Sequence, residues 1–130
     1  MALRFGILGT GNIARQFAGS FRTSTRCVVS AVGSRERASA EAFVAGYAPA
    51  AEATSYEGVL ASGEVDAVYV SFPNSMHREW TIRALRAGKH VLCEKPLGIN
   101  AGEVEEMFAE ARKAGRLLVE AFMYLSHPLT

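Results

Sequence analysis

Leu3-Arg4-Phe5-Gly6-Ile7-Leu8-Gly9-Thr10-Gly11-Asn12-Ile13-Ala14 is the stretch that decides the fold of this chain. An apolar run of strand length is followed directly by a G-x-G-x-x-A pattern, and apolar residues then recur at helical spacing, at Ile13, Phe17 and Phe21. A strand before the glycines and a helix after them make this pattern a dinucleotide-binding fingerprint. The alternative is a tight turn between a strand and a helix that binds no ligand.

The small residues of the fingerprint have separate physical tasks. Gly9 permits the tight turn, Gly11 has no side chain to keep a pyrophosphate away, and Ala14 lets the helix pack closely on the strand. The exposed N–H groups and the positive dipole end of the helix then favour phosphate groups. We therefore expect the turn through Thr10, Asn12 and Ile13 to hold the diphosphate of a dinucleotide.

The composition is typical of a globular domain, with 130 residues, 49% of them hydrophobic and 21% charged. This length suits one domain, since ~150 residues per domain is the usual size. With 14 Lys and Arg against 13 Asp and Glu, no net field would attract nucleic acid or an anionic membrane. The apolar runs are far shorter than the ~20 residues that a membrane helix needs, and no signal peptide is visible. We expect a cytoplasmic protein without nucleic-acid or membrane partners.

The cysteine content argues against a metal centre. Cys27 and Cys93 are too few and too far apart for a zinc or C-x-x-C pattern. Both lie in or beside apolar segments, so we expect buried free thiols, no disulfide and no metal site.

Strand-like and helix-like segments alternate along the chain, which predicts β-α-β units and a parallel sheet covered on both faces. The expected strands are residues 3–8, 26–32, 67–71, 89–93 and 117–121, with a short one near 50–53. The expected helices are residues 12–22, 36–46, 55–61, 75–87 and 101–114. The stretches Thr54-Ser55-Tyr56-Glu57 and Asn100-Ala101-Gly102-Glu103 are typical of N-cap and capping-box starts. The predicted fold is a doubly wound, six-stranded Rossmann sheet of order 3-2-1-4-5-6.

In such a sheet the ligand crevice lies outside the carboxyl ends of the strands, at the switch between strands 1 and 4. The segments that follow the strands therefore matter most. They are residues 9–13, 34–37, 72–77 and 94–96, and the chain from 122 onward.

The segment after the second strand predicts which nucleotide binds. About 20 residues beyond the glycines, an NAD-binding domain carries an acidic residue for the ribose 2′-hydroxyl, whereas an Arg accommodates a 2′-phosphate. This chain has Ser34 at that position, followed by Arg35 and Arg37. A guanidinium can hold a phosphate through two hydrogen bonds, so NADP is favoured over NAD. Two alternatives remain: Ser34 could only cap the next helix with both arginines solvated, or Glu36 could turn toward the ribose.

Two further motifs carry a family resemblance over essentially the whole chain. They are P-N-x-x-H at residues 73–77 and A-G-K-H-V-x-x-E-K-P at residues 87–96, and the chain also has E-A-F-M-Y at residues 120–124. With these motifs the chain resembles the glucose–fructose oxidoreductase and inositol dehydrogenase (Gfo/Idh/MocA) family, and within it the NADP-dependent dihydrodiol and xylose dehydrogenases. The resemblance implies a hydride transfer between a nicotinamide cofactor and a sugar, polyol or diol.

The resemblance also implies roles for single residues. Lys95 is the active-site lysine beside the hydroxyl that is oxidised, and Pro96 follows a cis peptide that aims it. Glu94 lies beside the nicotinamide ribose, whereas Asn74 and His77 line the nicotinamide side. Desolvation and the positive nicotinamide would both lower the pKa of such a lysine and prepare it to move a proton. The alternatives are a surface Lys95 paired with Glu94, and a His77 that only stabilises its helix.

The full set of candidates combines both lines of reasoning. Lys95 is the catalytic candidate, and the expected cofactor contacts are Gly9, Thr10, Gly11, Asn12, Ile13, Ser34, Arg35, Arg37, Ser71, Phe72, Pro73, Asn74, His77, Glu94, Lys95 and Pro96.

Members of this family continue into a second domain that supplies the substrate pocket. We therefore expect residues 1–121 to be the dinucleotide-binding domain and residues 122–130 the start of a connection, with catalysis incomplete in this chain alone. Leu125 stands where many relatives have an arginine. Phe122, Met123, Tyr124, Leu125 and Leu129 would form an apolar strip that promotes self-association.

Two other functions compete with the oxidoreductase. A non-catalytic nucleotide-binding module or sensor would use the same fingerprint without turnover. A methyltransferase-like nucleoside binder also has a glycine-rich first turn, but E-K-P and Arg35 have no task there.

Overall fold

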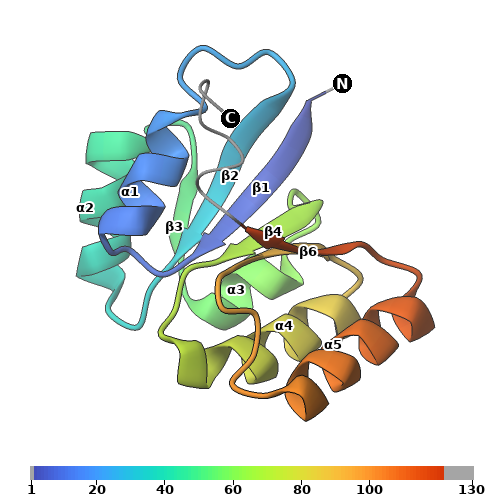
Figure 1. Ribbon diagram of the computed structural model, residues 1–130. Helices are drawn as coiled ribbons and strands as arrows, with labels where there is room; N and C mark the ends of the chain where they lie inside the picture. Colours follow the sequence, from blue (N-terminus) through green and yellow to red (C-terminus); the bar gives the residue numbers. More distant parts are fainter. Residues whose placement is uncertain (1, 122–130) are drawn as a thin grey trace, which may run out of the picture.

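The computed structural model describes residues 2–121 and consists of six strands, five α-helices and a short 3-10 helix η1 (Figure 1). The strands are β1 Leu3–Leu8, β2 Cys27–Gly33, β3 Glu52–Thr54, β4 Ala67–Val70, β5 His90–Glu94 and β6 Leu118–Ala121. The helices are α1 Asn12–Gly19, α2 Arg37–Tyr47, α3 Tyr56–Ala61, η1 Asn74–Met76, α4 His77–Arg86 and α5 Ala101–Ala114. Each predicted element is present, and the differences are confined to its ends.

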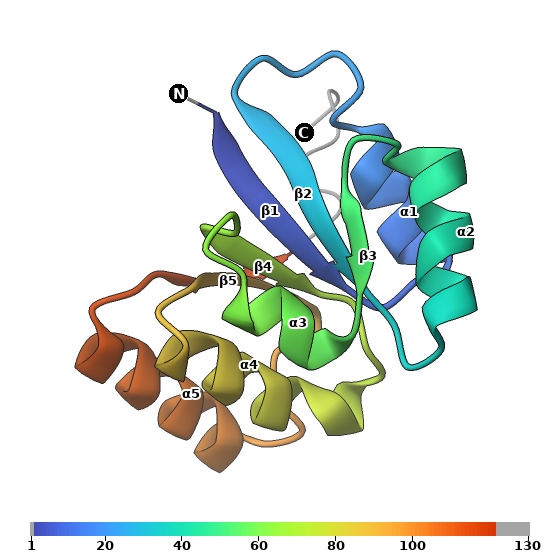
Figure 2. The same ribbon diagram turned by 180° about the vertical axis from the view of Figure 1, so that it is seen from behind.

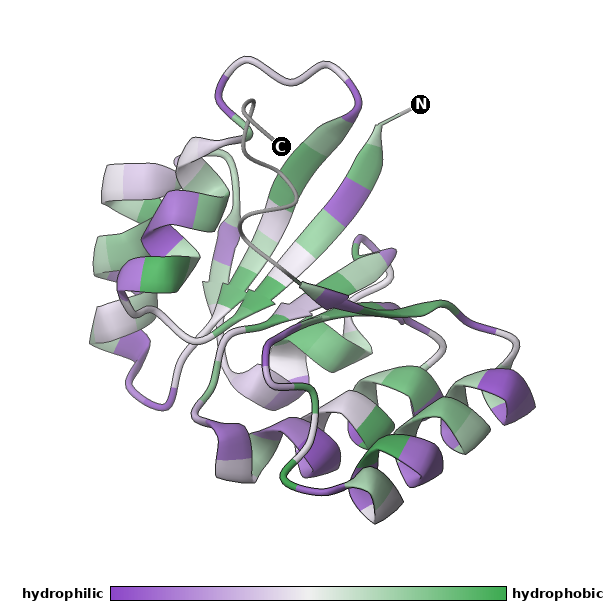
Figure 3. Ribbon diagram, in the orientation of Figure 1, coloured by the Kyte–Doolittle hydropathy of each residue, from purple (hydrophilic) through white to green (hydrophobic). Residues whose placement is uncertain are grey.

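The sheet has the predicted topology. All strand pairs are parallel, and the order is β3-β2-β1-β4-β5-β6. Helices α1 and α2 cover one face, whereas α3, α4 and α5 cover the other (Figures 1 and 2). Figure 3 shows hydrophobic and hydrophilic residues alternating along α4 and α5, as expected for helices that pack one side against a sheet.

Aromatic packing fixes α1 on the sheet. Phe17 stacks on Tyr69 of β4 with ring centroids 3.9 Å apart, and both Phe17 and Phe21 contact Phe5 of β1. The helical spacing of these phenylalanines predicted an inward face, and the contacts confirm it. Because α1 is held by its inner face, its N-terminus is fixed above the carboxyl end of β1.

Lys89, in the G-K-H part of the resemblance motif, has a structural role. Its ammonium group is buried and donates hydrogen bonds to the carbonyls of Ser62 at 2.6 Å and Val65 at 2.7 Å. The lysine thereby ties the beginning of β5 to the chain between α3 and β4. This contact joins the amino end of β5 to the segment that leads into β4, at the end of the sheet away from the crevice.

An ion pair fastens β1 to the start of β4 at the same, amino-terminal end of the sheet. The Arg4 guanidinium donates to both oxygens of Asp66, at 3.1 and 2.9 Å, and the Arg4 backbone N–H adds a bond of 2.9 Å. These hydrogen bonds lower the pKa of Asp66 to about 2. The folded state therefore holds this carboxylate charged at pH values where an unfolded chain protonates it.

We expect Asp66→Asn to lower the free energy of unfolding by about 1 kcal/mol at pH 7, a modest effect because the pair is partly solvated. A depressed folded pKa stabilises above the unfolded pKa of about 4, and this stabilisation is lost as the pH falls toward about 2. Roughly half of the difference between wild type and variant should remain at pH 3. Urea unfolding at pH 7, 4 and 3 measures it, and a difference independent of pH would contradict the assignment.

Candidate functional site

The candidate site lies at the carboxyl ends of β1 and β4. The chain leaves β1 toward α1 on one face of the sheet and leaves β4 toward α4 on the other face (Figure 1). This divergence opens a crevice between the two connections, and it is where doubly wound sheets bind their ligands. The segments after β1, β2, β4 and β5 border this crevice.

The two glycines of the first turn are needed for different reasons. Gly9 has a φ of 105°, and a Cβ there would lie 2.6 Å from the Ser71 hydroxyl oxygen, so the fold itself requires glycine. Gly11 has extended backbone angles, φ −79° and ψ −173°, which any residue can adopt. A Cβ on Gly11 would meet no atom within 4 Å. Neither the backbone conformation nor the packing requires glycine at this position. The space above the turn at Gly11 is therefore open.

The N-terminus of α1 is open to an anion. Its N-cap residue is Gly11, without a side-chain capping bond, and its first turn contains no acidic residue. Two other helices begin differently: Ser55 caps α3 and Asn100 caps α5, each within the stretch that was predicted to start the helix and each with a glutamate in the first turn. The uncapped amides and dipole of α1 are therefore free to bind a diphosphate. The residues present fit the cofactor that the fingerprint indicates.

The segment after β2 places Ser34, Arg35 and Arg37 near one another at the same edge. Ser34 is mostly buried, and its backbone N–H donates to the Thr54 carbonyl at 3.2 Å. The N-cap of α2 is Glu36, so the alternative in which Ser34 caps this helix is wrong. Arg35 is exposed, and the exposed Arg37 lies 3.8 Å from Glu41.

The segment after β4 presents Pro73 and Asn74 to solvent, whereas Phe72 is buried. The Phe72 ring packs against Tyr56 and Trp80, with centroids 4.7 and 5.8 Å away. The Phe72 ring therefore belongs to the core, so the expected cofactor contact of Phe72 would involve its backbone. The Ser71 hydroxyl donates to the Leu8 carbonyl at 2.8 Å, which joins this segment to the first turn.

Glu94, the last residue of β5, accepts a hydrogen bond from the Tyr69 hydroxyl. Tyr69 is buried, and this burial, together with the Glu94 carboxylate, raises the pKa of its phenol well above the usual value. Tyr69 thus remains a neutral donor that holds the Glu94 side chain on the α1 side of the sheet. Sequence analysis missed Tyr69, although a tyrosine inside a buried strand signals a polar partner.

Lys95 follows Glu94 at the edge of the crevice and is exposed. The peptide bond between Lys95 and Pro96 is cis, as the resemblance implied. Among the ion pairs within residues 2–121 none involves Lys95, so the alternative of a Lys95–Glu94 pair is not observed.

His77, the first residue of α4, is fully buried. Its Nε2 lies 2.6 Å from the Phe72 carbonyl and its Nδ1 lies 2.8 Å from the Pro96 carbonyl. A side chain with no exposed surface cannot touch a ligand in this crevice. The geometry therefore favours a structural role for His77 over direct cofactor contact.

The described residues also bear on the expected absence of a metal site and a membrane helix, and on the two cysteines. Within the described part of the chain no three His, Cys, Asp or Glu side chains gather as metal ligands, and no helix there is long and apolar enough to cross a membrane. Cys27 and Cys93 are free, but only Cys93 is buried as expected, since Cys27 at the start of β2 is partly exposed. Burial raises the pKa of the Cys93 thiol to about 12. The expected apolar strip within residues 122–130 lies outside the described residues.

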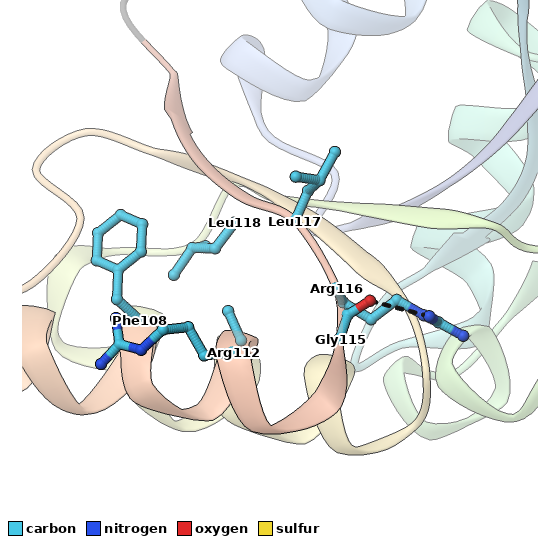
Figure 4. A pocket seen from close by; sticks show the side chains of 7 residues that line it. Phe108, Arg112, Gly115, Arg116, Leu117 and Leu118 are labelled. Atoms are coloured by element: carbon cyan, nitrogen blue, oxygen red, sulfur yellow. Dashed lines mark hydrogen bonds between the residues drawn. The ribbon is translucent and has the colours of Figure 1, made fainter.

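A hollow of about 340 Å³ lies between α5 and β6, away from the crevice (Figure 4). It is lined by Phe108, Ala111, Arg112, Gly115, Arg116, Leu117 and Leu118. Leu117 and Leu118 stand at the amino end of β6, whereas the crevice lies at the carboxyl ends of the strands. This hollow is therefore separate from the candidate site.

Comparison with known proteins identifies the family. A family model described as "Oxidoreductase family, NAD-binding Rossmann fold" (Gfo/Idh/MocA) matches residues 3–122. The chain belongs to this family. The resemblance of the sequence motifs to Gfo/Idh/MocA proteins is thereby confirmed, and residues 3–122 match the NAD-binding Rossmann fold of a family of oxidoreductases.

Several Gfo/Idh/MocA relatives are similar over nearly the whole chain. D-xylose 1-dehydrogenase (NADP(+)) 2 from Haloferax volcanii is 40% identical over 98% of this chain and 39% of its own length. Trans-1,2-dihydrobenzene-1,2-diol dehydrogenase from Sus scrofa is 39% identical over 93% of this chain and 37% of its own length. A 3-ketoreductase from Actinomadura kijaniata, solved in complex with NADP, superposes with a TM-score of 0.93 at 40% identity, over 99% of this chain and 41% of that one. The chain thus spans well under half the length of these relatives.

Proposed function

We propose that this chain is the NADP(H)-binding part of an oxidoreductase that moves a hydride between nicotinamide and a hydroxyl or carbonyl carbon of a sugar, polyol or diol. The observation that carries the proposal is Gly11, an exposed glycine that the fold does not require, at the uncapped N-terminus of α1. Membership of an oxidoreductase family and NADP-dependent relatives acting on a sugar or a diol support it.

The proposal assigns the two halves of the cofactor to opposite sides of the switch point. The diphosphate binds the amides of residues 10–13, and the adenosine 2′-phosphate binds Arg35, with Ser34 and Arg37 beside it. The nicotinamide half then extends toward the segments after β4 and β5, because β4 and β5 lie on the other side of β1 from β2. Asn74, Glu94 and Lys95 border that half.

The cofactor supplies the hydride chemistry at the nicotinamide ring when it is bound. In our proposal, Glu94, held by Tyr69, receives the nicotinamide ribose hydroxyls. The Lys95 amine takes the proton from the substrate hydroxyl during oxidation and returns it during reduction. In this proposal residues 1–121 form the cofactor-binding domain, and residues 122–130 begin the connection to a substrate-binding part.

We also propose a cytoplasmic location, because free cysteines are typical of a reducing compartment.

Ligand titration tests this function directly. We expect saturable NADPH binding, followed by nicotinamide fluorescence, weaker binding of NADH and none of S-adenosylmethionine. Absence of NADPH binding to folded protein would overturn the proposal, and preferential binding of S-adenosylmethionine would indicate the methyltransferase-like alternative. Turnover of D-xylose or a diol by the chain would exclude the alternative of a non-catalytic module.

Replacing Lys95 tests whether its ammonium group faces the nicotinamide. The oxidised ring carries a positive charge and the reduced ring does not, so the ammonium disfavours only NADP⁺. Because a partly solvated charge pair a few ångströms apart is worth about 1 kcal/mol, Lys95→Met should raise the affinity for NADP⁺ relative to NADPH roughly fivefold. Lys113→Met, an exposed lysine of α5, is the control and should leave the ratio unchanged. An unchanged ratio in Lys95→Met would place the amine elsewhere.

A further inference from the structure

The segment that carries Lys95, residues 94–97, is held from both sides by residues that lie outside the crevice. We propose that His77 and Glu120 are positioning residues that clamp the backbone of Pro96 and Leu97 and thereby aim Lys95 at the nicotinamide. This inference rests on the proposed function, and it adds two residues that would act without touching the cofactor.

The first anchor comes from α4. The fully buried His77 ring approaches the Pro96 carbonyl through Nδ1 and the Phe72 carbonyl through Nε2, at 2.8 and 2.6 Å. The ring therefore joins the segment after β5 to the segment after β4. In Figure 1 the start of α4 lies beside the orange segment between β5 and α5. Through Phe72, the same ring positions the neighbouring Pro73 and Asn74.

The second anchor comes from β6. The Glu120 carboxylate accepts a hydrogen bond from the Leu97 backbone N–H at 2.7 Å. Glu120 pairs with Cys93 in the sheet, so its position is set by strand register. The buried Leu97 side chain packs into the core formed with α4 and α5. Pro96 and Leu97 are thus fixed by one helix and one strand.

These anchors matter because the exposed Lys95 side chain makes no hydrogen bond or ion pair with another residue of the described chain. The position of the Lys95 side chain is therefore set by the backbone of the residues on either side of it. Glu94 is fixed by the sheet and by Tyr69, whereas Pro96 and Leu97 are fixed by His77 and Glu120. Loss of either clamp would free one flank of Lys95 while the first turn and the Arg35 segment stay in place.

Comparing two ligands separates a loss of Lys95 positioning from a general loss of protein stability in variants of His77 and Glu120. NADPH contacts both sides of the crevice, whereas 2′,5′-ADP lacks the nicotinamide half and reports only the first turn and the 2′-phosphate site. We expect His77→Leu and Glu120→Met to weaken NADPH binding about tenfold, because the backbone that borders the nicotinamide half loses its fixed position, and to change 2′,5′-ADP binding less than about twofold. A partly unfolded variant would weaken both ligands equally.

Conservative variants sharpen the test. The Asn amide nitrogen takes the place of Nδ1, so His77→Asn keeps the bond to Pro96, whereas the longer His77→Gln keeps only the bond to Phe72. Glu120→Gln keeps an acceptor for Leu97. We expect His77→Asn and Glu120→Gln to bind NADPH within about threefold of wild type and His77→Gln to resemble His77→Leu.

The outcomes are distinguishable. Unchanged NADPH affinity in His77→Leu and Glu120→Met, parallel losses of both ligands in all variants, or equal behaviour of His77→Asn and His77→Gln would overturn the clamp. Wild-type protein that binds neither NADPH nor 2′,5′-ADP would instead overturn the proposed function, and the clamp with it.

Discussion

Gly11→Val should abolish most of the NADPH affinity while leaving the protein folded. The extended backbone of Gly11 suits a β-branched residue, and the open space around its Cβ means that no packing is disturbed. A valine would occupy the volume through which a diphosphate reaches the α1 amides. Losing two charge-assisted hydrogen bonds corresponds to roughly 3 kcal/mol, or about a 100-fold weaker complex.

Gly19→Val is the matched control for this experiment. Gly19 ends the same helix, a Cβ there also meets no atom within 4 Å, and it lies at the end of α1 away from the crevice. We expect the control to bind NADPH as wild type does, and both variants to change the free energy of unfolding by less than about 1 kcal/mol. Full NADPH affinity in Gly11→Val would mean that no phosphate binds at this turn.

Arg35→Ala should remove most of the preference of the site for NADPH over NADH. The exposed Arg35 makes no ion pair with another residue of the described chain, so its guanidinium is available to a 2′-phosphate. A charge-assisted bond of this kind is worth about 2 kcal/mol, so NADPH affinity should fall roughly 30-fold. NADH, which lacks the phosphate, should bind within about twofold of its wild-type affinity. Parallel titrations with both cofactors measure the change in selectivity.

Arg37→Ala supplies the comparison for Arg35. Its guanidinium lies 3.8 Å from Glu41, so part of its charge is already compensated. We expect its removal to weaken NADPH about threefold, as a solvated charge at longer range does. Equal losses of NADPH and NADH in Arg35→Ala would refute the 2′-phosphate role. A larger effect at Arg37 than at Arg35 would reassign the phosphate contact to α2.

Local sequence patterns were sufficient to predict the fold and the glycine turn between β1 and α1. The alternation of strand and helix periods predicted the parallel sheet, and the strand order followed from the known handedness and switch of doubly wound folds. The caps at Ser55 and Asn100 and the turn at Gly9 depend on residues close in sequence. Such features are readable because the interacting groups are separated by only a few residues.

Contacts between distant segments could not be read in this way. Tyr69 reaches Glu94 because Tyr69 pairs with Leu92, and alternation in β5 then puts Glu94 on the same face. His77 was an ambiguous histidine in a motif, and only the meeting of two loops at its ring distinguished burial from ligand contact. Glu120 had no predicted role, since its bond to Leu97 requires β6 to lie beside β5.

By itself, then, the sequence determined the layered α/β architecture, the family and the glycine turn at the end of β1, because hydrophobic period and turn chemistry act over short stretches of chain. Only the tertiary structure decided how the segment bearing Lys95 is held. That decision depends on strand register and helix placement, which bring His77, Pro96, Leu97 and Glu120 together from separate elements.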